Sequence, residues 1–442
     1  MTTKELLNKK IGYVSLGCDK NRVDLEKIIA TLTSVGFKTT ANPNEANIII
    51  INTCSFIESA RKESVNTILE MANLKAATCE KIIVTGCLNQ MNYSDLESSF
   101  PEVDKFVKVA DNSKIVQTIF NLYNVKLKDN NYNCSSISRV ITTPKHYAYL
   151  KISEGCNNFC SYCTIPYIRG RFYSTPIEEL VNEAKNLAKN GVKELILVGQ
   201  DVTKYGFDLY NEYALPKLIN ELSKIKEIKW IRLLYCYPEL VSDELISVIK
   251  NNDKVVKYID IPLQHVNSTI LKKMNRRTNK EQIIALINKL KTEIPNIAIR
   301  STFIVGFPGE TKKQFNEIIK FLKEYKLNKV GFFAYSKEPG TLAFNMPNQK
   351  SKLIKTLRVK KAYKNQEKIS YLNNINLLNK TIPVIIDSSE NDYFIGRTQF
   401  NAPEIDEIVY VFGNAKIGDI VNVRITDTSN YDLKGEIYES TK

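Results

Sequence analysis

Three cysteines close together near the middle of the chain constrain it more than any other feature. Cys156, Cys160 and Cys163 lie within the short segment Glu154–Cys163. Three thiolates on one loop suit three irons of a cubane iron–sulfur cluster and leave the fourth iron without a protein ligand. A structural zinc site uses four protein ligands, so three cysteines favour a metal centre that is open for chemistry. The alternative is a zinc site completed by a distant ligand such as His146.

The ends and apolar runs of the chain indicate its compartment. The first ten residues lack the apolar run of a signal peptide, and the longest aliphatic stretch, Ile48–Ile51, is far too short to span a bilayer. We therefore expect a cytoplasmic protein that has no membrane contact and keeps its thiols reduced. Nine cysteines, an odd number, then favour metal ligands over disulfides.

The charge of the chain is unevenly distributed. A formal charge of +14 fits a partner that carries phosphate, such as RNA or a ribosome, although a Lys- and Asn-rich composition explains it equally well. Residues 380–442 hold 6 Lys/Arg and 11 Asp/Glu, a net charge of −5, which leaves +19 for the rest. The tail therefore differs in character from the remainder of the chain.

The first hundred residues predict a small parallel sheet. Short aliphatic runs alternate with helical patterns from Lys10 to about Ala110, as in parallel strands joined by right-handed crossovers. We place this domain at residues 8–125. Its expected strands are Ile11–Leu16, Asn47–Asn52, Lys81–Thr85 and Lys105–Val109.

Three further cysteines follow three of these strands. Cys18, Cys54 and Cys87 each lie just beyond the carboxyl end of an expected strand. In an open parallel sheet these ends share one edge, where ligands bind. The three thiols therefore predict a second metal site. The alternative is three unrelated buried cysteines, which is the reading we also give to Cys79, Cys134 and Cys236.

A second alternation of strands and helices begins at His146, after a polar stretch around Cys134 that predicts a linker. Six βα repeats predict a partial parallel (βα)6 barrel at residues 142–375, with chemistry on the loops at the carboxyl ends of its strands. The Cys156 trio lies on the first of these loops. The expected strands are Tyr147–Ile152, Glu194–Gly199, Lys229–Tyr235, Val256–Ile261, Ala298–Val305 and Lys329–Ala334.

Two helices are also expected. One opens at Thr175–Glu178, with Thr175 as its cap and Pro176 at its first position. The other is the basic run Gln349–Leu378, which either touches RNA or is a solvated connecting helix.

The tail predicts a small antiparallel β-barrel at residues 378–442, of the kind that binds nucleic acid or protein. Its net negative charge is unfavourable for RNA and suits a basic protein. The expected strands are Thr381–Asp387, Tyr393–Arg397, Ile408–Phe412, Ile420–Thr426 and Leu433–Tyr438.

An open iron at the mouth of a parallel barrel is suited to binding S-adenosylmethionine through its amino and carboxylate groups. Gly306 and Glu310, which follow the fifth strand, could bring backbone close to the adenosine, although they could equally form an ordinary turn. Gln200 and Asp201 are candidates for the methionine end. His265 either faces the cofactor or is a hydrogen-bonded structural histidine.

The segment from His146 to Gly170, which includes Ile165-Pro166 and Arg169, closely resembles the methylthiotransferase branch of radical S-adenosylmethionine enzymes. The resemblance covers nearly the whole chain and implies a C-terminal barrel of the TRAM type. It implies two 4Fe-4S clusters: an auxiliary one held by the trio that begins at Cys18, and the radical-generating one held by the trio that begins at Cys156. One cofactor molecule would yield the 5′-deoxyadenosyl radical, and another would supply a methyl group to the inserted sulfur. An electron donor and a sulfur source are further implied partners.

The residues around Cys18 indicate the substrate. Members that modify tRNA typically read Tyr-Gly-Cys-Gln-Met-Asn there, whereas this chain reads Ser15-Leu-Gly-Cys-Asp-Lys-Asn-Arg-Val-Asp24, which resembles the ribosomal branch. That branch modifies the β-carbon of an aspartate in small-subunit ribosomal protein S-12, free or in the subunit. The tail segments Ala402–Asp406 and Tyr431–Glu436 also resemble the ribosomal branch. Leu25 departs from this branch, which usually has a small hydroxyl residue at that position. The alternatives are methylthiolation of a tRNA adenosine and a zinc-stabilised RNA-binding protein without catalysis.

Overall fold

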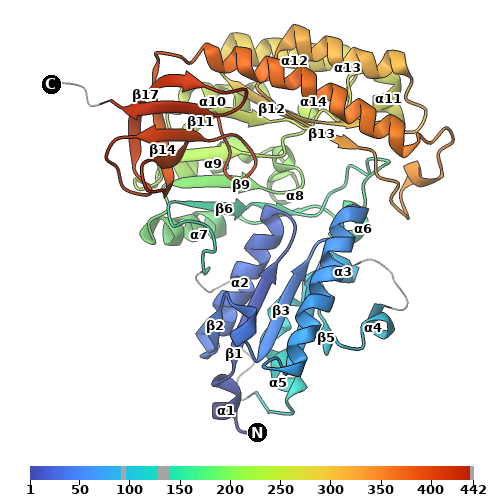
Figure 1. Ribbon diagram of the computed structural model, residues 1–442, viewed down its shortest axis with the longest axis vertical. Helices are drawn as coiled ribbons and strands as arrows, with labels where there is room; N and C mark the ends of the chain where they lie inside the picture. Colours follow the sequence, from blue (N-terminus) through green and yellow to red (C-terminus); the bar gives the residue numbers. More distant parts are fainter. Residues whose placement is uncertain (91–95, 128–138, 439–442) are drawn as a thin grey trace. The chain divides into compact units, whose positions relative to one another are not determined.

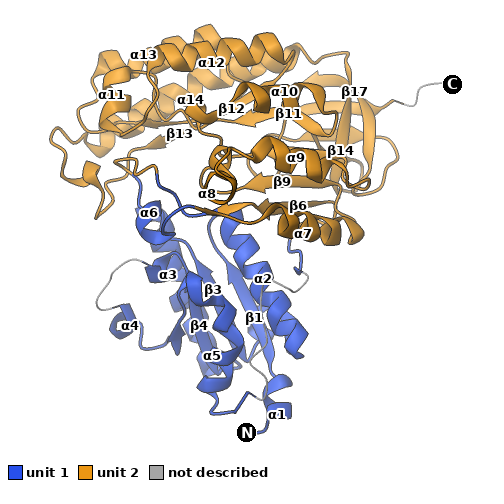
Figure 2. Ribbon diagram, turned by 180° about the vertical axis from the view of Figure 1, so that it is seen from behind, with its two compact units in different colours: residues 1–142, 154–157, 163–172 blue, residues 143–153, 158–162, 173–442 orange. Residues whose placement is uncertain are grey.

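The computed structural model describes residues 1–90, 96–127 and 139–438, so the expected linker around Cys134 lies outside the described residues. The described chain forms two compact units, which are considered separately (Figure 2). Unit 1 comprises residues 1–142, 154–157 and 163–172, and unit 2 comprises residues 143–153, 158–162 and 173–442.

Unit 1 is built on the predicted parallel sheet, with strand order β2-β1-β3-β4-β5. The prediction missed β2, which is only three residues long and largely solvent-accessible. It also made the last strand too long, since β5 ends at Phe106. The strands are β1 (Lys10–Ser15), β2 (Lys38–Thr40), β3 (Ile48–Thr53), β4 (Lys81–Gly86) and β5 (Lys105–Phe106), and the longer helices are α2 (Asp19–Val35), α3 (Glu58–Ala72) and α5 (Ile115–Leu122).

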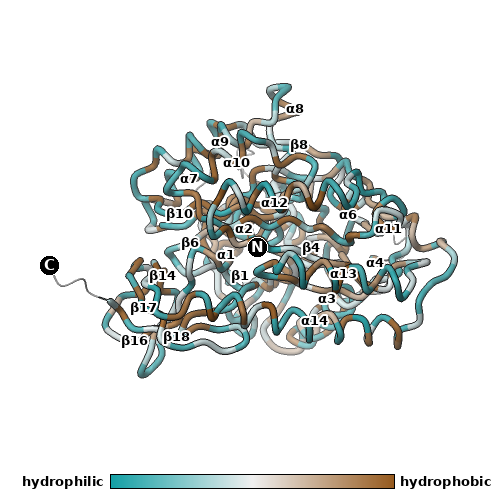
Figure 3. Tube along the Cα trace, turned by 90° about the horizontal axis from the view of Figure 1, so that it is seen from above, coloured by the Kyte–Doolittle hydropathy of each residue, from teal (hydrophilic) through white to brown (hydrophobic). Residues whose placement is uncertain are grey.

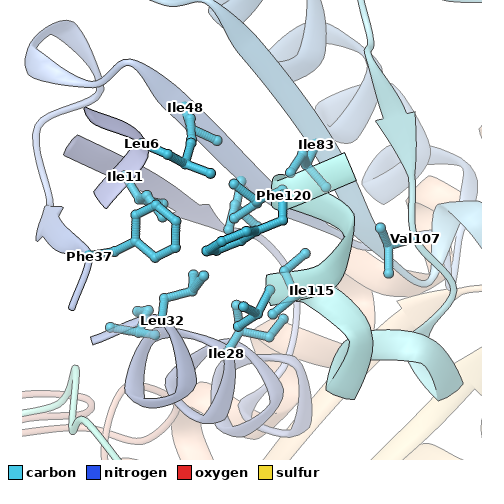
Figure 4. Close-up of a cluster of buried hydrophobic side chains, with 14 of the residues drawn as sticks. Leu6, Ile11, Ile28, Leu32, Phe37, Ile48, Ile83, Val107, Ile115 and Phe120 are labelled. Carbon is cyan, nitrogen blue, oxygen red and sulfur yellow. The ribbon is translucent and has the colours of Figure 1, made fainter. Parts of the chain in front are cut away.

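The core of unit 1 explains this arrangement. Every residue of β3 is buried, as expected for a central parallel strand that is covered on both faces. On one face Phe37 and Phe120 meet edge to face with ring centroids 6.3 Å apart, and Ile28 of α2 packs beside them (Figure 4). Gly36 ends α2 with φ +107°, a conformation that glycine adopts without a Cβ clash.

Unit 2 contains the predicted open parallel sheet, with strand order β13-β12-β11-β10-β9-β6 (Figure 1). Chain order and sheet order coincide, which is the arrangement of a partial barrel. The strands are β6 (Tyr147–Lys151), β9 (Glu194–Val198), β10 (Trp230–Leu233), β11 (Val255–Asp260), β12 (Ala298–Val305) and β13 (Lys329–Ala334). The longer helices are α7 (Ile177–Lys189), α9 (Leu215–Ser223), α10 (Asp243–Asn251), α12 (Lys280–Glu293), α13 (Lys312–Tyr325) and α14 (Lys352–Ile375).

The predicted start of α7 was wrong by one residue. Pro176 is the N-cap, and no side chain makes a capping hydrogen bond. Thr175 still belongs to extended chain, because its backbone N–H donates to Ile152 O and its carbonyl accepts the Tyr205 hydroxyl.

The basic run does form a helix, α14, which carries both hydrophilic and hydrophobic residues along its length (Figure 3). It is anchored to the sheet: Phe332 N donates to the Tyr363 hydroxyl at 3.2 Å. Among the described helices none is both long and apolar enough to cross a bilayer.

The tail forms a closed barrel with strand order β14-β15-β16-β18-β17. One neighbouring pair, β16 with β18, is parallel, whereas the prediction was antiparallel throughout. On its other side β18 approaches β17 closely at Gly435, where a Cβ would lie 2.5 Å from Val423 Cγ1. The strands are β14 (Thr381–Ser389), β15 (Phe394–Thr398), β16 (Val409–Phe412), β17 (Ile420–Thr428) and β18 (Leu433–Ile437).

Much of the acidity of the tail is directed at the rest of unit 2. The carboxylate of Asp406 accepts the Tyr258 hydroxyl at 2.8 Å and pairs with Arg300 at 3.4 Å. Among the acidic residues that the structure describes in the tail, five contact the sheet or the chain beside it in this way. The expectation that the negative charge faces a basic partner therefore applies only to the others. The five contacts are Asp387 with His146, Glu404 with Tyr147, Asp406 with Arg300, Glu407 with Lys329, and Asp419 with Lys193.

One buried carboxylate joins the barrel to the sheet. Glu194, at the start of β9, pairs with Arg232 at 2.7 Å and with Arg397 of β15 at 2.8 Å. Its side chain is 0% exposed. Burial raises the pKa of Glu194, but the guanidinium groups of Arg397 and Arg232 lower it more, so it stays below the ordinary value. The pairing compensates three charges that would be costly if buried alone.

We predict that Glu194→Gln lowers the free energy of unfolding of unit 2 by about 3–5 kcal/mol, because it leaves two buried guanidinium groups without their shared carboxylate. Urea denaturation of the full-length protein, followed by the fluorescence of Trp230, measures this effect. The control is Glu45→Gln, which removes the exposed partner of Lys10 and should not change the unfolding midpoint. Equal midpoints for wild type and Glu194→Gln would contradict the prediction.

Candidate iron–sulfur sites

The fold of unit 1 brings its three candidate cysteines to one edge of the sheet. Cys18 follows β1 and is the N-cap of α2, and Cys54 follows β3. Cys87 follows β4, whose Gly86 is paired with Thr53 of β3. Because β1, β3 and β4 are parallel neighbours, the three thiols lie along the same rim.

Glycines allow the close approach of these segments. Gly17 has φ +89°, and a Cβ there would lie 2.9 Å from Cys54 Sγ. Gly86 has φ +94°, and a Cβ there would lie 2.3 Å from Thr53 O. A side chain at either position would push apart the turns that carry the thiols.

The rim is a poor place for free thiolates and a suitable one for a metal cluster. Burial raises the pKa of Cys87 to about 12, although Arg169 acts in the opposite direction. Burial likewise raises the pKa of Cys54. A bound metal deprotonates such thiols, because it replaces the proton with a stronger positive charge.

The guanidinium of Arg169 contacts this rim. Its guanidinium donates to Asp24 at 2.7 Å, to Glu154 at 3.2 Å and to Cys87 Sγ at 3.4 Å. It also donates to Asn21 Oδ1. The sequence singled out Arg169 only as part of a motif, because nothing local in the sequence identifies partners this distant.

The second trio lies on the loop that follows β6 and the short strand β7 (Ser153–Glu154). Cys156 and Cys163 belong to unit 1, and Cys160 belongs to unit 2. Gly155 precedes Cys156 with φ +74°, and a Cβ there would lie 2.2 Å from Arg171 O. Cys156 N donates to Gly170 O at 3.1 Å, which holds the two ends of the loop together within unit 1.

Cys160 lies beside two side chains of unit 2 that the sequence analysis did not single out. Its sulfur lies 3.3 Å from the Tyr237 hydroxyl and 3.9 Å from a guanidinium nitrogen of Arg276. The Arg276 guanidinium lies over the Tyr237 ring, 4.2 Å from its centroid, and donates to Pro262 O at 2.8 Å. A buried guanidinium and a phenol hydroxyl therefore lie next to the sulfur of Cys160.

The residues expected to bind S-adenosylmethionine lie at the carboxyl ends of β9 and β12, and some already have protein partners. Asp201, after Gln200, accepts Asn158 Nδ2 at 2.9 Å and Thr203 Oγ1 at 2.7 Å, so it supports the cysteine loop. Burial raises its pKa. The second pair, Gly306 and Glu310, closes a turn of its own.

Glu310 is fully buried and accepts the backbone N–H groups of Gly306 and Phe307. It pairs with Arg358 of α14 at 3.0 Å. Burial nevertheless raises its pKa. The carboxylate thus fixes the turn after β12, and Gly306, with φ +76°, makes this turn possible.

Each of the two histidines is held through one ring nitrogen by hydrogen bonds within unit 2. Val266 N and Asn267 N both donate to Nδ1 of His265 at 2.9 Å, and burial lowers its pKa to about 3. His146 stands before β6, at the opposite end of this strand from the Cys156 loop, and its Nε2 lies 2.7 Å from Asp387 Oδ1. It is therefore not the fourth ligand that the zinc alternative needs.

The described residues contain no group of three His, Cys, Asp or Glu side chains gathered tightly around the position of a single metal ion. In a cubane cluster each thiolate binds a different iron, so its three sulfurs do not meet at one point. The donor set of the trio in unit 1, three cysteines on a rim bounded by Gly17 and Gly86, fits such a cluster.

Comparison with known proteins gives three family matches in chain order. Residues 10–108 match Uncharacterized protein family UPF0004, residues 150–322 match the Radical SAM superfamily, and residues 380–437 match the TRAM domain. Among solved structures, the radical S-adenosylmethionine methyltransferase TsrM from Kitasatospora setae is similar with a TM-score of 0.56 and 13% identity, over 76% of this chain and 77% of that one. At this identity the likeness concerns the fold alone.

Curated relatives match over almost the whole chain. A protein named ribosomal protein uS12 methylthiotransferase RimO from Thermoanaerobacter sp. (strain X514) is 46% identical over 97% of this chain and 100% of its own. Proteins of the same name from Clostridium perfringens (strain SM101 / Type A) and Clostridium novyi (strain NT) are 48% and 47% identical, over 97% and 98% of this chain and 98% and 99% of theirs. The chain therefore belongs to the RimO family of radical SAM methylthiotransferases.

Proposed function

We propose that this chain methylthiolates the β-carbon of an aspartate in ribosomal protein uS12, free or in the small subunit. The observation that carries the proposal is 46–48% identity to uS12 methylthiotransferases over 97% of the chain, from the first sheet to the tail barrel. The proposal includes a cytoplasmic location and domains at residues 8–125, 142–375 and 378–442.

Two 4Fe-4S clusters belong to the proposal. Cys18, Cys54 and Cys87 would hold an auxiliary cluster, and the trio of Cys156, Cys160 and Cys163 would hold the cluster that binds S-adenosylmethionine. The bound cofactors would supply a radical that removes one hydrogen from the substrate carbon. They would also supply the sulfur and the methyl group that take the place of this hydrogen. The reaction would also need an external electron donor and a source of sulfur.

The protein's own side chains would position these groups. Arg276 and Tyr237 support Cys160, and Asp201 holds Asn158 in the same loop. Gln200, Asp201, Gly306 and Glu310 remain the proposed cofactor contacts. Because Asp201 and Glu310 already have protein partners, we expect them to shape the site through loop conformation as well as by direct contact.

The test is the mass of purified uS12 after anaerobic incubation with reconstituted enzyme, reductant, a sulfide source and S-adenosylmethionine. We expect a gain equal to one methylthio group replacing one hydrogen, localised by fragmentation to an aspartate. The control is uS12 with that aspartate changed to alanine, which should stay unmodified. Unmodified uS12, together with methylthio-adenosine in tRNA treated in parallel, would favour the alternative function.

Alanine variants of the two trios should lose different steps of the reaction. We predict that Cys156→Ala/Cys160→Ala/Cys163→Ala abolishes reductive cleavage of S-adenosylmethionine, because this cleavage needs the cluster with the open iron. Cys18→Ala/Cys54→Ala/Cys87→Ala should still cleave the cofactor but leave uS12 without the methylthio group. Chromatography of 5′-deoxyadenosine and mass spectrometry of uS12 measure the two steps.

Each unit offers a matched control for this comparison. Cys79 of unit 1 and Cys236 of unit 2 are buried and lie outside both trios. Cys79→Ala and Cys236→Ala should keep the iron content of the wild type. If Cys18→Ala/Cys54→Ala/Cys87→Ala also lost reductive cleavage of S-adenosylmethionine while remaining folded, the separate roles of the trios would be wrong.

A further inference from the structure

The search for unassigned chemistry leads to Arg169. Its side chain is only 2% exposed, and its guanidinium reaches three parts of unit 1 that are far apart in the sequence. Asp24 and Asn21 lie on α2, Cys87 follows β4, and Glu154 belongs to β7. A buried arginine requires compensation, which the carboxylates of Asp24 and Glu154 provide.

The contact with sulfur distinguishes Arg169 from a purely structural ion pair. One nitrogen, Nη1, serves both carboxylates, and the other, Nη2, donates to Cys87 Sγ at 3.4 Å. The planar fork of arginine can serve these two directions at once, which the single ammonium of lysine does not reproduce. A donor aimed at a cysteine sulfur stabilises negative charge on that sulfur.

Reduction adds one electron to a cluster and makes it more negative. Hydrogen bonds to the ligand sulfurs and nearby positive charge therefore raise the reduction potential of the cluster. Arg169 would supply both to the cluster that Cys87 is proposed to hold.

We propose that Arg169 is a positioning residue for the auxiliary cluster: it orients Cys87 and favours the reduced form of the cluster. This inference rests on the proposed function, in which Cys87 is a cluster ligand. Because Arg169 follows Cys163 by six residues and also binds Glu154, it fixes both ends of the neighbouring cysteine loop within unit 1.

Unit 1 contains a matched control for this role. Arg139 also has a side chain only 2% exposed, and it pairs at 2.9 Å with Glu26, on the same helix as Asp24. The two arginine side chains are equally exposed, and each pairs with a carboxylate of α2. Arg169 differs in that it also binds Glu154 and Asn21 and has a direct contact with Cys87 Sγ.

The experiment uses the full-length chain with Cys156→Ala/Cys160→Ala/Cys163→Ala, so that only the auxiliary cluster forms on anaerobic reconstitution. In this background Arg169→Gln/Asp24→Asn removes the guanidinium together with one carboxylate, which leaves the net charge unchanged. Arg139→Gln/Glu26→Gln does the same at the control pair. Each protein is titrated with dithionite and followed by electron paramagnetic resonance.

For the Arg169 double variant we expect the ratio of reduced to oxidised cluster at fixed potential to fall about tenfold, equal to a shift of about 59 mV for one electron. The control pair should leave this ratio unchanged. Arg169→Lys keeps the positive charge but not the planar guanidinium, so it should lower the ratio of reduced to oxidised cluster by less than the double variant. The same measurement is made on Arg169→Lys if the double variant does not fold.

Two results would overturn the inference, and they are distinguishable. A cluster that forms in the triple-alanine background and has the same potential in both Arg169 variants means that Arg169 is only structural. A triple-alanine background that is folded and binds no iron means that the proposed ligands Cys18, Cys54 and Cys87 are wrong, and the inference fails with them.

Discussion

Parallel strands end at a common edge, and this constraint underlies both candidate metal sites. In unit 1 it gathers Cys18, Cys54 and Cys87 although they lie 36 and 33 positions apart in the sequence. In unit 2 it places the loops after β9 and β12 at the carboxyl ends of one sheet. Glycines with positive φ, Gly17 and Gly86 at the first trio and Gly155 at the second, turn the chain sharply enough for the thiols to follow directly.

Charge compensation is the second physical theme. Each trio has a buried guanidinium beside one of its sulfurs: Arg169 at Cys87 and Arg276 at Cys160. Their surroundings differ, because Arg169 is paired with carboxylates whereas Arg276 lies over the ring of Tyr237. For this reason we expect the proposed clusters at the two sites to differ in reduction potential, which fits their different proposed roles.

The alternation of aliphatic runs and helical patterns was enough to predict both sheets and the barrel, because buried parallel strands have a strong local pattern. It did not predict β2, which is short and mostly accessible, nor the parallel β16–β18 pair, which depends on barrel closure. Thr175 had the right residue type for a cap, but its backbone groups are bonded elsewhere. Local preference loses to tertiary contacts at such positions.

The cysteines were predictable from the sequence because their spacing is local, or because each follows a strand. The residues around them were not. Arg169 and Asp24 are 145 positions apart, and no pattern in the sequence joins them. The acidic tail shows the same limit: its net charge of −5 indicated a basic partner, whereas Asp406 and Glu407 are bonded to Arg300 and Lys329 of the same unit.

The central claim is that one chain carries two cubane clusters, one on each cysteine trio. The most direct measurement is the iron and acid-labile sulfide content of the anaerobically reconstituted full-length protein, with Mössbauer spectroscopy of the iron. We predict about eight iron atoms and about eight sulfides per chain, all in 4Fe-4S clusters. About four of each would leave one trio without a cluster, and a colourless protein with tetrahedral zinc would contradict the account altogether.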